Sequence, residues 1–258
     1  MKLEGQHAII TGGGSGIGLA CAQAFLNDGA HVTIAGRSMA RLENALEQLS
    51  ELPGECFALQ IDIADEASVQ QGIEEAHARQ PLTIAVANAG TGAAGPFLET
   101  PTEDWDRVIQ TNLNGTFYTF KHAGRAMQDS GGAMCAISSI AGLKTHHWMS
   151  AYCTSKAGID MLVRNTADEL GAFGIRVNSV CPGLVVTELS AGLHQTDPIR
   201  EDYLSCMPIQ RLGQPEDIGN AVRFLCGPEA GWITGTTIAV DGGHHLRRGP
   251  NILAGQEV

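Results

Sequence analysis

Tyr152 and Lys156 stand four positions apart in a segment whose apolar residues recur with helical spacing. Residues four apart lie on one face of a helix, so the Lys156 ammonium is expected near the Tyr152 phenol. The unperturbed pKa of tyrosine, about 10, is too high for a base at neutral pH, and a nearby cation lowers it. The pair therefore predicts proton transfer at a phenol oxygen, although Tyr and Lys at this spacing also occur as plain surface pairs.

Ser139 strengthens the chemical interpretation. It follows the apolar run 133–138 and precedes Tyr152 in the chain. A serine at the end of a strand can bring its hydroxyl to the same substrate oxygen that the tyrosine protonates or deprotonates. Ser139, Tyr152 and Lys156 together predict general acid/base catalysis.

Seven short apolar or β-branched runs must position these residues. They alternate with amphipathic stretches and cover residues 7–10, 31–35, 56–61, 82–87, 133–138, 175–180 and 236–240. They are apolar throughout rather than alternating, which is typical of a parallel sheet covered by helices on both faces. The pattern predicts an α/β, Rossmann-type, doubly wound fold with a seven-stranded parallel sheet flanked by helices.

Two helix starts carry local signals. Residues 100–103 read as a capping box with Pro101 at the first helical position, and residues 214–217 put Pro215 and two acids in a first turn. No internal repeat or linker interrupts the chain. We therefore expect one domain over residues 1–258.

The stretch "TGGGSGIG", residues 11–18, falls between the first predicted strand and the first predicted helix. A loop without β-carbons lets backbone amides and the positive end of a helix approach a pyrophosphate. The spacing T-G-x-x-x-G-x-G predicts dinucleotide binding. A methyltransferase could use the same loop for S-adenosylmethionine, but it would have no need for Ser139, Tyr152 and Lys156 together.

Composition excludes several classes of function. A formal net charge of −12 opposes binding to nucleic acid, and no apolar run approaches the ~18 residues of a membrane span. The first ten residues are too short and polar for a secretory leader. The seven cysteines are scattered without a C-x-x-C pair, which predicts no metal and a reduced compartment. We expect a cytoplasmic location.

Over about residues 5–245, the sequence resembles the short-chain dehydrogenase/reductase family. The glycine pattern and the Y-x-x-x-K of Tyr152 and Lys156 carry the resemblance, and four further segments agree: "ANAG" with Asn88, Ala89 and Gly90, "NLNGTF" with Asn112, "CPGLVVTE" and "ITGTTIAVDGG". The resemblance implies an oxidoreductase that interconverts a secondary alcohol and a ketone with NAD(P). A non-catalytic nucleotide-binding relative would be expected to lack a member of the catalytic tetrad.

The resemblance implies a role for each tetrad residue, and all four are present. Tyr152 is the general acid/base, and Ser139 holds the carbonyl or alcohol oxygen. Lys156 lowers the pKa of Tyr152 and binds the nicotinamide ribose. Asn112 holds a water that links Lys156 to solvent.

Cofactor contacts follow from the same resemblance. Residues 182–187 should run beside the nicotinamide with the Thr187 hydroxyl on its carboxamide, Asp62 should contact adenine, and Asn88 should support the ribose side. The complete predicted set is Gly12, Gly14, Ser15, Gly16, Ile17, Gly18, Arg37, Ser38, Asp62, Ile63, Asn88, Ala89, Gly90, Tyr152, Lys156, Pro182, Gly183, Val185 and Thr187.

The residues after the second strand bear on the choice of cofactor. An NAD-binding fold typically has an acid about 20 residues beyond the glycines, where this chain has Gly36 followed by Arg37 and Ser38, with Arg41 one turn on. A missing carboxylate removes repulsion of a 2′-phosphate, and a guanidinium offers it a forked donor. NADP(H) is favoured, with NAD(H) as the alternative.

The substrate pocket is expected between the loop after Ser139 and a substrate lid at about 184–210. Candidate residues are mainly apolar: Leu143, His146, His147, Trp148, Leu184 and Leu189, with Leu193, Tyr203 and Met207 beyond them. They favour a hydrophobic alicyclic or steroid-like substrate. A 3-oxoacyl group on CoA or on a carrier protein is the alternative, although an acidic carrier would have to dock on an acidic chain.

The expected assembly is a homotetramer. Helices around 102–128 and 151–171 carry apolar residues on more than one side, which indicates burial against another subunit. The resemblance implies contact through these helices and the C-terminal strand. A short C-terminal extension at about 246–258 has no assigned role.

Overall fold

The computed structural model describes residues 1–250 and residue 252. Within this part of the chain, seven parallel strands form one sheet in the order β3-β2-β1-β4-β5-β6-β7. The strands are β1 (His7–Thr11), β2 (His31–Gly36), β3 (Cys56–Gln60), β4 (Ile84–Ala87), β5 (Gly132–Ile137), β6 (Ile175–Pro182) and β7 (Thr237–Val240). The strand order reverses at β1, beside β4, which confirms the predicted doubly wound fold.

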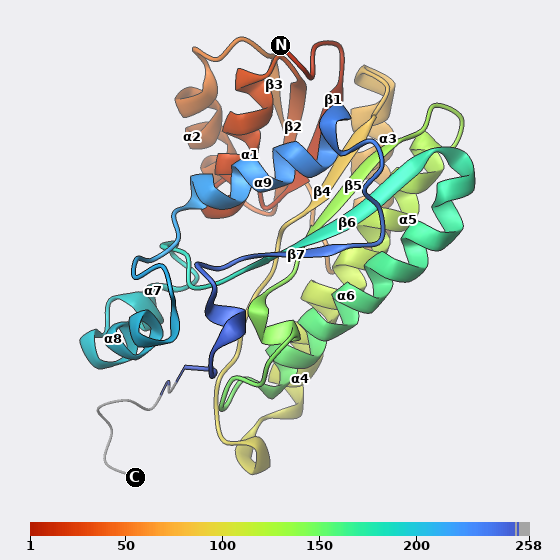
Figure 1. Cartoon of the computed structure of the whole chain (residues 1–258). Coiled ribbons are helices and arrows are strands. Elements are labelled where there is room, and N and C mark those ends of the chain that lie inside the picture. The colour runs from red at the N-terminus through yellow and green to blue at the C-terminus, as the bar shows by residue number, and fades with distance from the viewer. Residues whose placement is uncertain (251, 253–258) are drawn as a thin grey trace.

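Helices cover both faces of the sheet (Figure 1). On one face lie α1 (Gly16–Asn27), α2 (Met39–Leu49) and α9 (Pro215–Cys226), and on the other lie α3 (Glu66–Arg79), α5 (Gly115–Met127) and α6 (Ser150–Leu170). Phe25 and Ile218 fill the first layer, and Phe120 and Ile159 fill the second. Because β1 and β4 are buried on both faces, their sequences are apolar without alternation.

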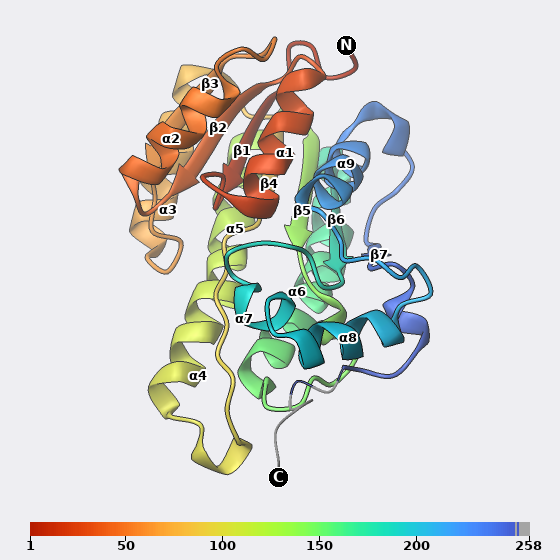
Figure 2. The same ribbon diagram turned by 90° about the vertical axis from the view of Figure 1, so that its left-hand side faces the viewer.

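One long helical run leads into the site (Figure 2). It consists of α4 (Thr102–Val108), a π-helical segment (Ile109–Asn114) and α5. The capping box predicted at residues 100–103 is wrong. The helix starts at Thr102 without a side-chain cap, because the Thr100 hydroxyl donates instead to the carbonyl of Pro96 at 3.0 Å.

The second predicted helix start is confirmed. Helix α9 begins at Pro215 with two acids in its first turn, and the Asp217 carboxylate accepts from the Gln214 amide at 2.8 Å. This contact fixes the start of a helix that packs against α1.

Two short helices, α7 (Ala191–His194) and α8 (Asp197–Cys206), lie beyond the carboxyl ends of the strands (Figures 1 and 2). They belong to residues 184–210, the predicted substrate lid, and this role stays a prediction. The predicted C-terminal extension, 246–258, falls partly outside the described residues. Among the described helices, none is both long and apolar enough to cross a membrane.

Candidate active site

The glycine loop between β1 and α1 is tightly packed. A β-carbon on Gly18 would lie 2.2 Å from the Gly12 carbonyl oxygen, and Gly12 itself has φ +67°. Asn88, after β4, makes two hydrogen bonds to Thr11. Its side-chain Nδ2 donates to the Thr11 carbonyl at 2.9 Å, and its backbone amide donates to the Thr11 hydroxyl at 3.0 Å. Helix α1 then starts after Ser15 with no side-chain cap. This close-packed loop and uncapped helix end fit the pyrophosphate of a dinucleotide.

The loop after β6 reaches back to this glycine loop. A β-carbon on Gly16 would lie 3.2 Å from Cγ2 of Thr187. Next to Thr187, Glu188 forms an ion pair of 3.0 Å with Arg41 in the first turn of α2. The loop after β6 therefore contacts both the glycine loop and the first turn of α2.

Arg37 and Ser38 stand at the end of β2, where they were predicted. Both are exposed, and none of the ion pairs among the described residues involves Arg37. The Ser38 hydroxyl accepts from the Arg41 amide at 3.4 Å and so caps α2. The Arg37 guanidinium is accessible to an anion.

Ser139, Tyr152 and Lys156 meet beyond the carboxyl end of β5. Lys156 Nζ donates to the carbonyl of Ile137 at 2.7 Å and lies 5.6 Å from the centroid of the Tyr152 ring. The Ser139 hydroxyl accepts from the Ala141 amide at 3.1 Å and shares a hydrogen bond with Tyr152. The three residues thus come together as their spacing predicted.

The electrostatics of this cluster differ from the sequence expectation. Burial raises the pKa of Tyr152, and the hydrogen bond with Ser139 only opposes that shift. Burial also lowers the pKa of Lys156 to about 8, against the opposing charge of Asp160. The lowered Tyr152 pKa expected from sequence is therefore not a property of this chain by itself, because desolvation of the phenolate outweighs the hydrogen bond with Ser139.

Asn112 lies in the π-helical segment and is almost fully buried. Its Nδ2 donates to the Thr91 carbonyl at 2.9 Å and to the Ser155 hydroxyl at 3.1 Å, while its Oδ1 accepts from the Thr91 amide at 2.8 Å. The side chain therefore ties the loop after β4 to α6, the helix of Tyr152 and Lys156. π-Helical segments are frequent at functional sites.

The remaining predicted cofactor residues also follow the carboxyl ends of strands. Asp62 comes after β3 and accepts from the Ala64 amide at 3.0 Å, and the neighbouring Ile63 is buried. Pro182 ends β6, and Gly183 leaves space that Asp241 occupies, since a β-carbon there would lie 2.9 Å from the Asp241 Cα.

Comparison with known proteins assigns the family. Residues 12–245 match the family described as "Enoyl-(Acyl carrier protein) reductase". The structure of a short-chain type dehydrogenase/reductase from Mycobacterium ulcerans is 37% identical with a TM-score of 0.94, and the match covers 98% of this chain and 94% of that one. This chain belongs to the short-chain dehydrogenase/reductase family.

Two further relatives narrow the reaction class. A galactitol 2-dehydrogenase (L-tagatose-forming) from Cereibacter sphaeroides is 35% identical over 248 residues, 94% of this chain and 96% of the relative. A 7α-hydroxysteroid dehydrogenase, solved with NADH and 7-oxo glycochenodeoxycholic acid, is 35% identical with a TM-score of 0.90, covering 94% and 95%. This short-chain dehydrogenase/reductase is an NAD(P)-dependent oxidoreductase that acts on CH–OH groups.

Only part of the predicted substrate set comes together in this family member. Leu184, Tyr203 and Met207 are buried in one cluster, and Trp148 and Leu193 pack against it. Leu143 is 50% and Leu189 is 64% exposed. The exposed side chains include His147, whose ring stacks on that of Trp148.

Sequence reasoning missed His244. It is fully buried, with its ring 5.7 Å from that of Tyr203 and 6.4 Å from that of His146, and its Nδ1 has no hydrogen-bond partner. No motif marks it, since it directly follows "ITGTTIAVDGG", the last segment that carries the family resemblance. His244 therefore joins the C-terminal segment to Tyr203 on α8 and to His146 in the loop after Ser139.

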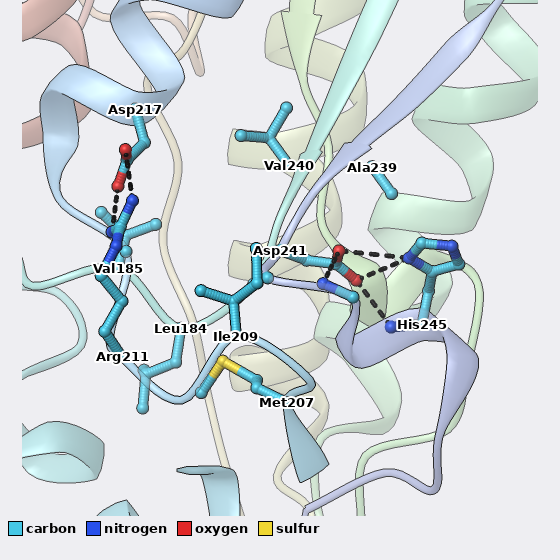
Figure 3. A pocket seen from close by; sticks show the side chains of 14 residues that line it. Leu184, Val185, Met207, Ile209, Arg211, Asp217, Ala239, Val240, Asp241 and His245 are labelled. Atoms are coloured by element: carbon cyan, nitrogen blue, oxygen red, sulfur yellow. Dashed lines mark hydrogen bonds and ion pairs between the residues drawn. The ribbon is translucent and has the colours of Figure 1, made fainter.

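A cavity of about 380 Å³ lies beside the loop Gly183–Val185 (Figure 3). At one end the Asp241 carboxylate meets the His245 ring at 2.9 Å, and at the other the Arg211 guanidinium pairs with Asp217 at 2.6 Å. The residues that line this cavity do not include Ser139, Tyr152 or Lys156. The cavity and the cluster of Ser139, Tyr152 and Lys156 are therefore lined by different residues.

Proposed function

We propose that this chain interconverts a secondary alcohol and its ketone with Tyr152 as the general acid/base and NADP(H) as the preferred cofactor. The observation that carries the proposal is the convergence of Ser139, Tyr152 and Lys156 beside a close-packed glycine loop. An accidental surface pair would not be buried against a strand-end serine.

Each catalytic side chain has a defined task in this proposal. The nicotinamide, when bound, supplies or accepts the hydride. The Ser139 hydroxyl oxygen accepts a hydrogen bond from the backbone amide of Ala141, so the hydroxyl proton of Ser139 is available to the substrate oxygen. Tyr152, hydrogen-bonded to Ser139, moves the proton at the same oxygen, and Lys156 supports the phenolate electrostatically. In this proposal Asn112 holds a water that links Lys156 to solvent, so that protons can be exchanged.

The cofactor preference rests on the end of β2. Gly36 supplies no carboxylate to repel a 2′-phosphate, and the exposed Arg37 offers a guanidinium. In the same proposal, the glycine loop holds the pyrophosphate, Asp62 contacts adenine, and Thr187 contacts the carboxamide. NAD(H) is the alternative.

We assign a hydrophobic alicyclic or steroid-like substrate to the region beneath α8. Leu184, Tyr203 and Met207 form an apolar wall, with Trp148 packed against it. The alternative is a 3-oxoacyl thioester, which is supported by a relative named 3-oxoacyl-[acyl-carrier-protein] reductase that is 31% identical over 245 residues. The net charge of −12 opposes docking of an acidic carrier protein.

The proposal extends to the assembly and location of the protein. Phe117 on α5 and Met161 on α6 are 43% and 50% exposed, which supports a homotetramer formed through these helices. All seven cysteines are free thiols, as a reducing cytoplasm would keep them.

A screen of ketones and alcohols with NADPH, NADP, NADH and NAD tests the proposal. Turnover of hydrophobic cyclic ketones is expected, and Tyr152→Phe should reduce it by about 10²- to 10⁴-fold while cofactor affinity stays within about threefold. Tyr118→Phe, which removes a half-buried phenol on α5, is the control. Undiminished turnover in Tyr152→Phe would overturn the mechanism. Cofactor binding without turnover of any substrate would support a non-catalytic relative instead.

A further inference from the structure

Asp160 is a buried carboxylate one helical turn beyond Lys156. Its side chain is on the same face of α6 as the ammonium, and the residue is only 3% exposed. A buried carboxylate is costly unless charged or hydrogen-bonding partners compensate it. Its partners therefore indicate what the residue does.

Hydroxyl groups from three neighbouring strands converge on this carboxylate. Ser179 on β6 donates to Oδ1 at 3.1 Å, and Thr237 on β7 donates to it at 3.4 Å. Ser138, directly after β5, also hydrogen-bonds Asp160, and its hydroxyl lies 3.2 Å from the Lys156 carbonyl. The Cys181 thiol lies 3.8 Å from Oδ2. Burial raises the pKa of Asp160, and the hydrogen bonds from Ser138, Ser179 and Thr237 oppose that shift by stabilising the ionised form.

The turn after Ser139 packs closely against Lys156 and the Asp160 carboxylate. A β-carbon on Gly142 would lie 2.9 Å from the Lys156 carbonyl carbon and 3.0 Å from Oδ2 of Asp160. The Lys156 ammonium, one helical turn away, is the charged group that acts electrostatically on the carboxylate, since burial raises the pKa of the Cys181 thiol to about 12 and keeps that group neutral. Lys156 and Asp160 therefore share one water-poor region.

We infer that Asp160 is a positioning residue that acts through Lys156: it is the buried counter-charge that keeps the ammonium protonated while the strand-end hydroxyls hold it in place. This rests on the proposed function, in which a charged Lys156 supports Tyr152. Burial alone favours neutral lysine, and Asp160 opposes that effect. Asp160 does not touch the reacting atoms in this scheme.

Direct titration of Lys156 tests the inference without any substrate. The chain contains four lysines, Lys2, Lys121, Lys144 and Lys156, so ¹³C-labelled lysine gives few side-chain NMR signals, and Lys156→Arg assigns the relevant one. In Asp160→Asn, which keeps the shape but removes the charge, the Lys156 pKa should fall by about one unit or more. An unchanged Lys156 titration in folded Asp160→Asn would overturn the inference.

Activity provides a second readout. The loss of kcat/KM in Asp160→Asn should be small near pH 6, where Lys156 is protonated in both proteins, and reach at least about tenfold above pH 8. A merely structural role would lower activity equally at all pH values, and that result would also overturn the inference. Should no substrate be found, the titration still decides the role of Asp160, so failure of the proposed function is distinguishable.

Two variants complete the design. Asp168→Asn removes an exposed acid from the same helix and should leave the Lys156 titration unchanged. Asp160→Glu keeps the charge and should restore the Lys156 pKa to within about half a unit of wild type. If Asp160→Asn does not fold, Thr237→Val and Ser179→Ala, which remove donors from the carboxylate, should each lower the Lys156 pKa by a smaller step, and unchanged titration in both would count against the proposal.

Discussion

The Lys156 ammonium donates to the backbone carbonyl of Ile137, the last residue of β5, across 2.7 Å. This contact joins the catalytic helix to the strand that ends just before Ser139. The position of the ammonium relative to Tyr152 is thus set by α6 and β5 together.

Replacing Lys156 by Met should reduce turnover by about 10²- to 10⁴-fold, because the phenolate loses its cation while the apolar stem still packs. Steady-state kinetics at pH 7 measure the loss, and thermal unfolding checks the fold. Lys121→Met, on the outer side of α5, is the matched control. Turnover within threefold of wild type in Lys156→Met would show that the ammonium does not serve the phenol.

The combined change Gly36→Asp and Arg37→Leu should reverse the cofactor preference. The new carboxylate repels a 2′-phosphate and accepts ribose hydroxyls, and it has room, since a β-carbon on Gly36 makes only an ordinary contact of 3.6 Å. Loss of Arg37 alone should weaken NADPH about ten- to a hundredfold. The measurement is kcat/KM for NADPH over NADH. A ratio below one in the wild type would mean that Arg37 does not bind a phosphate.

Gly18→Ala should lower the free energy of unfolding by about 3 kcal/mol, because its β-carbon would overlap the Gly12 carbonyl oxygen at 2.2 Å. Gly14→Ala is the control, since its nearest contacts are at 3.4 Å and the cost should stay below about 1 kcal/mol. Urea unfolding compares the two variants. Equal stability of both would contradict the close packing of the glycine loop.

Light scattering at micromolar concentration should give four times the 27.2 kDa of the chain. Phe117→Asp should lower this mass, because it puts a charge on the exposed apolar side of α5. Leu98→Asp, at a side chain 95% exposed near the start of the long helical run, should not. A monomer mass for the wild type would exclude the proposed tetramer.

Stability should fall on acidification because of His7, which is fully buried between the Gln80 carbonyl and the Thr33 hydroxyl. Burial lowers the pKa of His7, and the hydrogen bond to Gln80 opposes this. Below the unfolded pKa of about 6.5, the unfolded chain binds the proton more readily, so stability is complete above that pH and declines beneath it.

Urea unfolding at pH 8, 6.5 and 5.5 measures this decline. It should be shallower in His7→Gln than in wild type, and unchanged in His147→Gln, which alters an exposed histidine. An identical decline in His7→Gln and wild type would assign the acid sensitivity to other groups.

The parallel sheet and the proximity of Tyr152 and Lys156 could be predicted from local patterns. Continuous apolar runs such as 84–87 indicate strands buried on both faces, and helical spacing alone brings Tyr152 and Lys156 to one side of α6. The glycine loop was recognisable because its backbone must be free of β-carbons. In each case one short segment carries the physical reason.

Local pattern failed where another contact or burial acts on the same group. Residues 100–103 have the composition of a capping box, yet the Thr100 hydroxyl bonds the preceding turn instead. The expected drop in the Tyr152 pKa likewise considered the nearby ammonium and not the burial that raises the pKa.

The sequence by itself determined the fold class, the order of the strands along the chain and the placement of Tyr152 and Lys156 on one side of a helix, since these depend on periodicity and spacing. Only the tertiary structure brought Ser179 and Thr237 to Asp160, His244 to Tyr203, and Glu188 to Arg41. These contacts join segments far apart in the chain, and no periodicity encodes them, because they depend on how helices and strands pack once the sheet has formed.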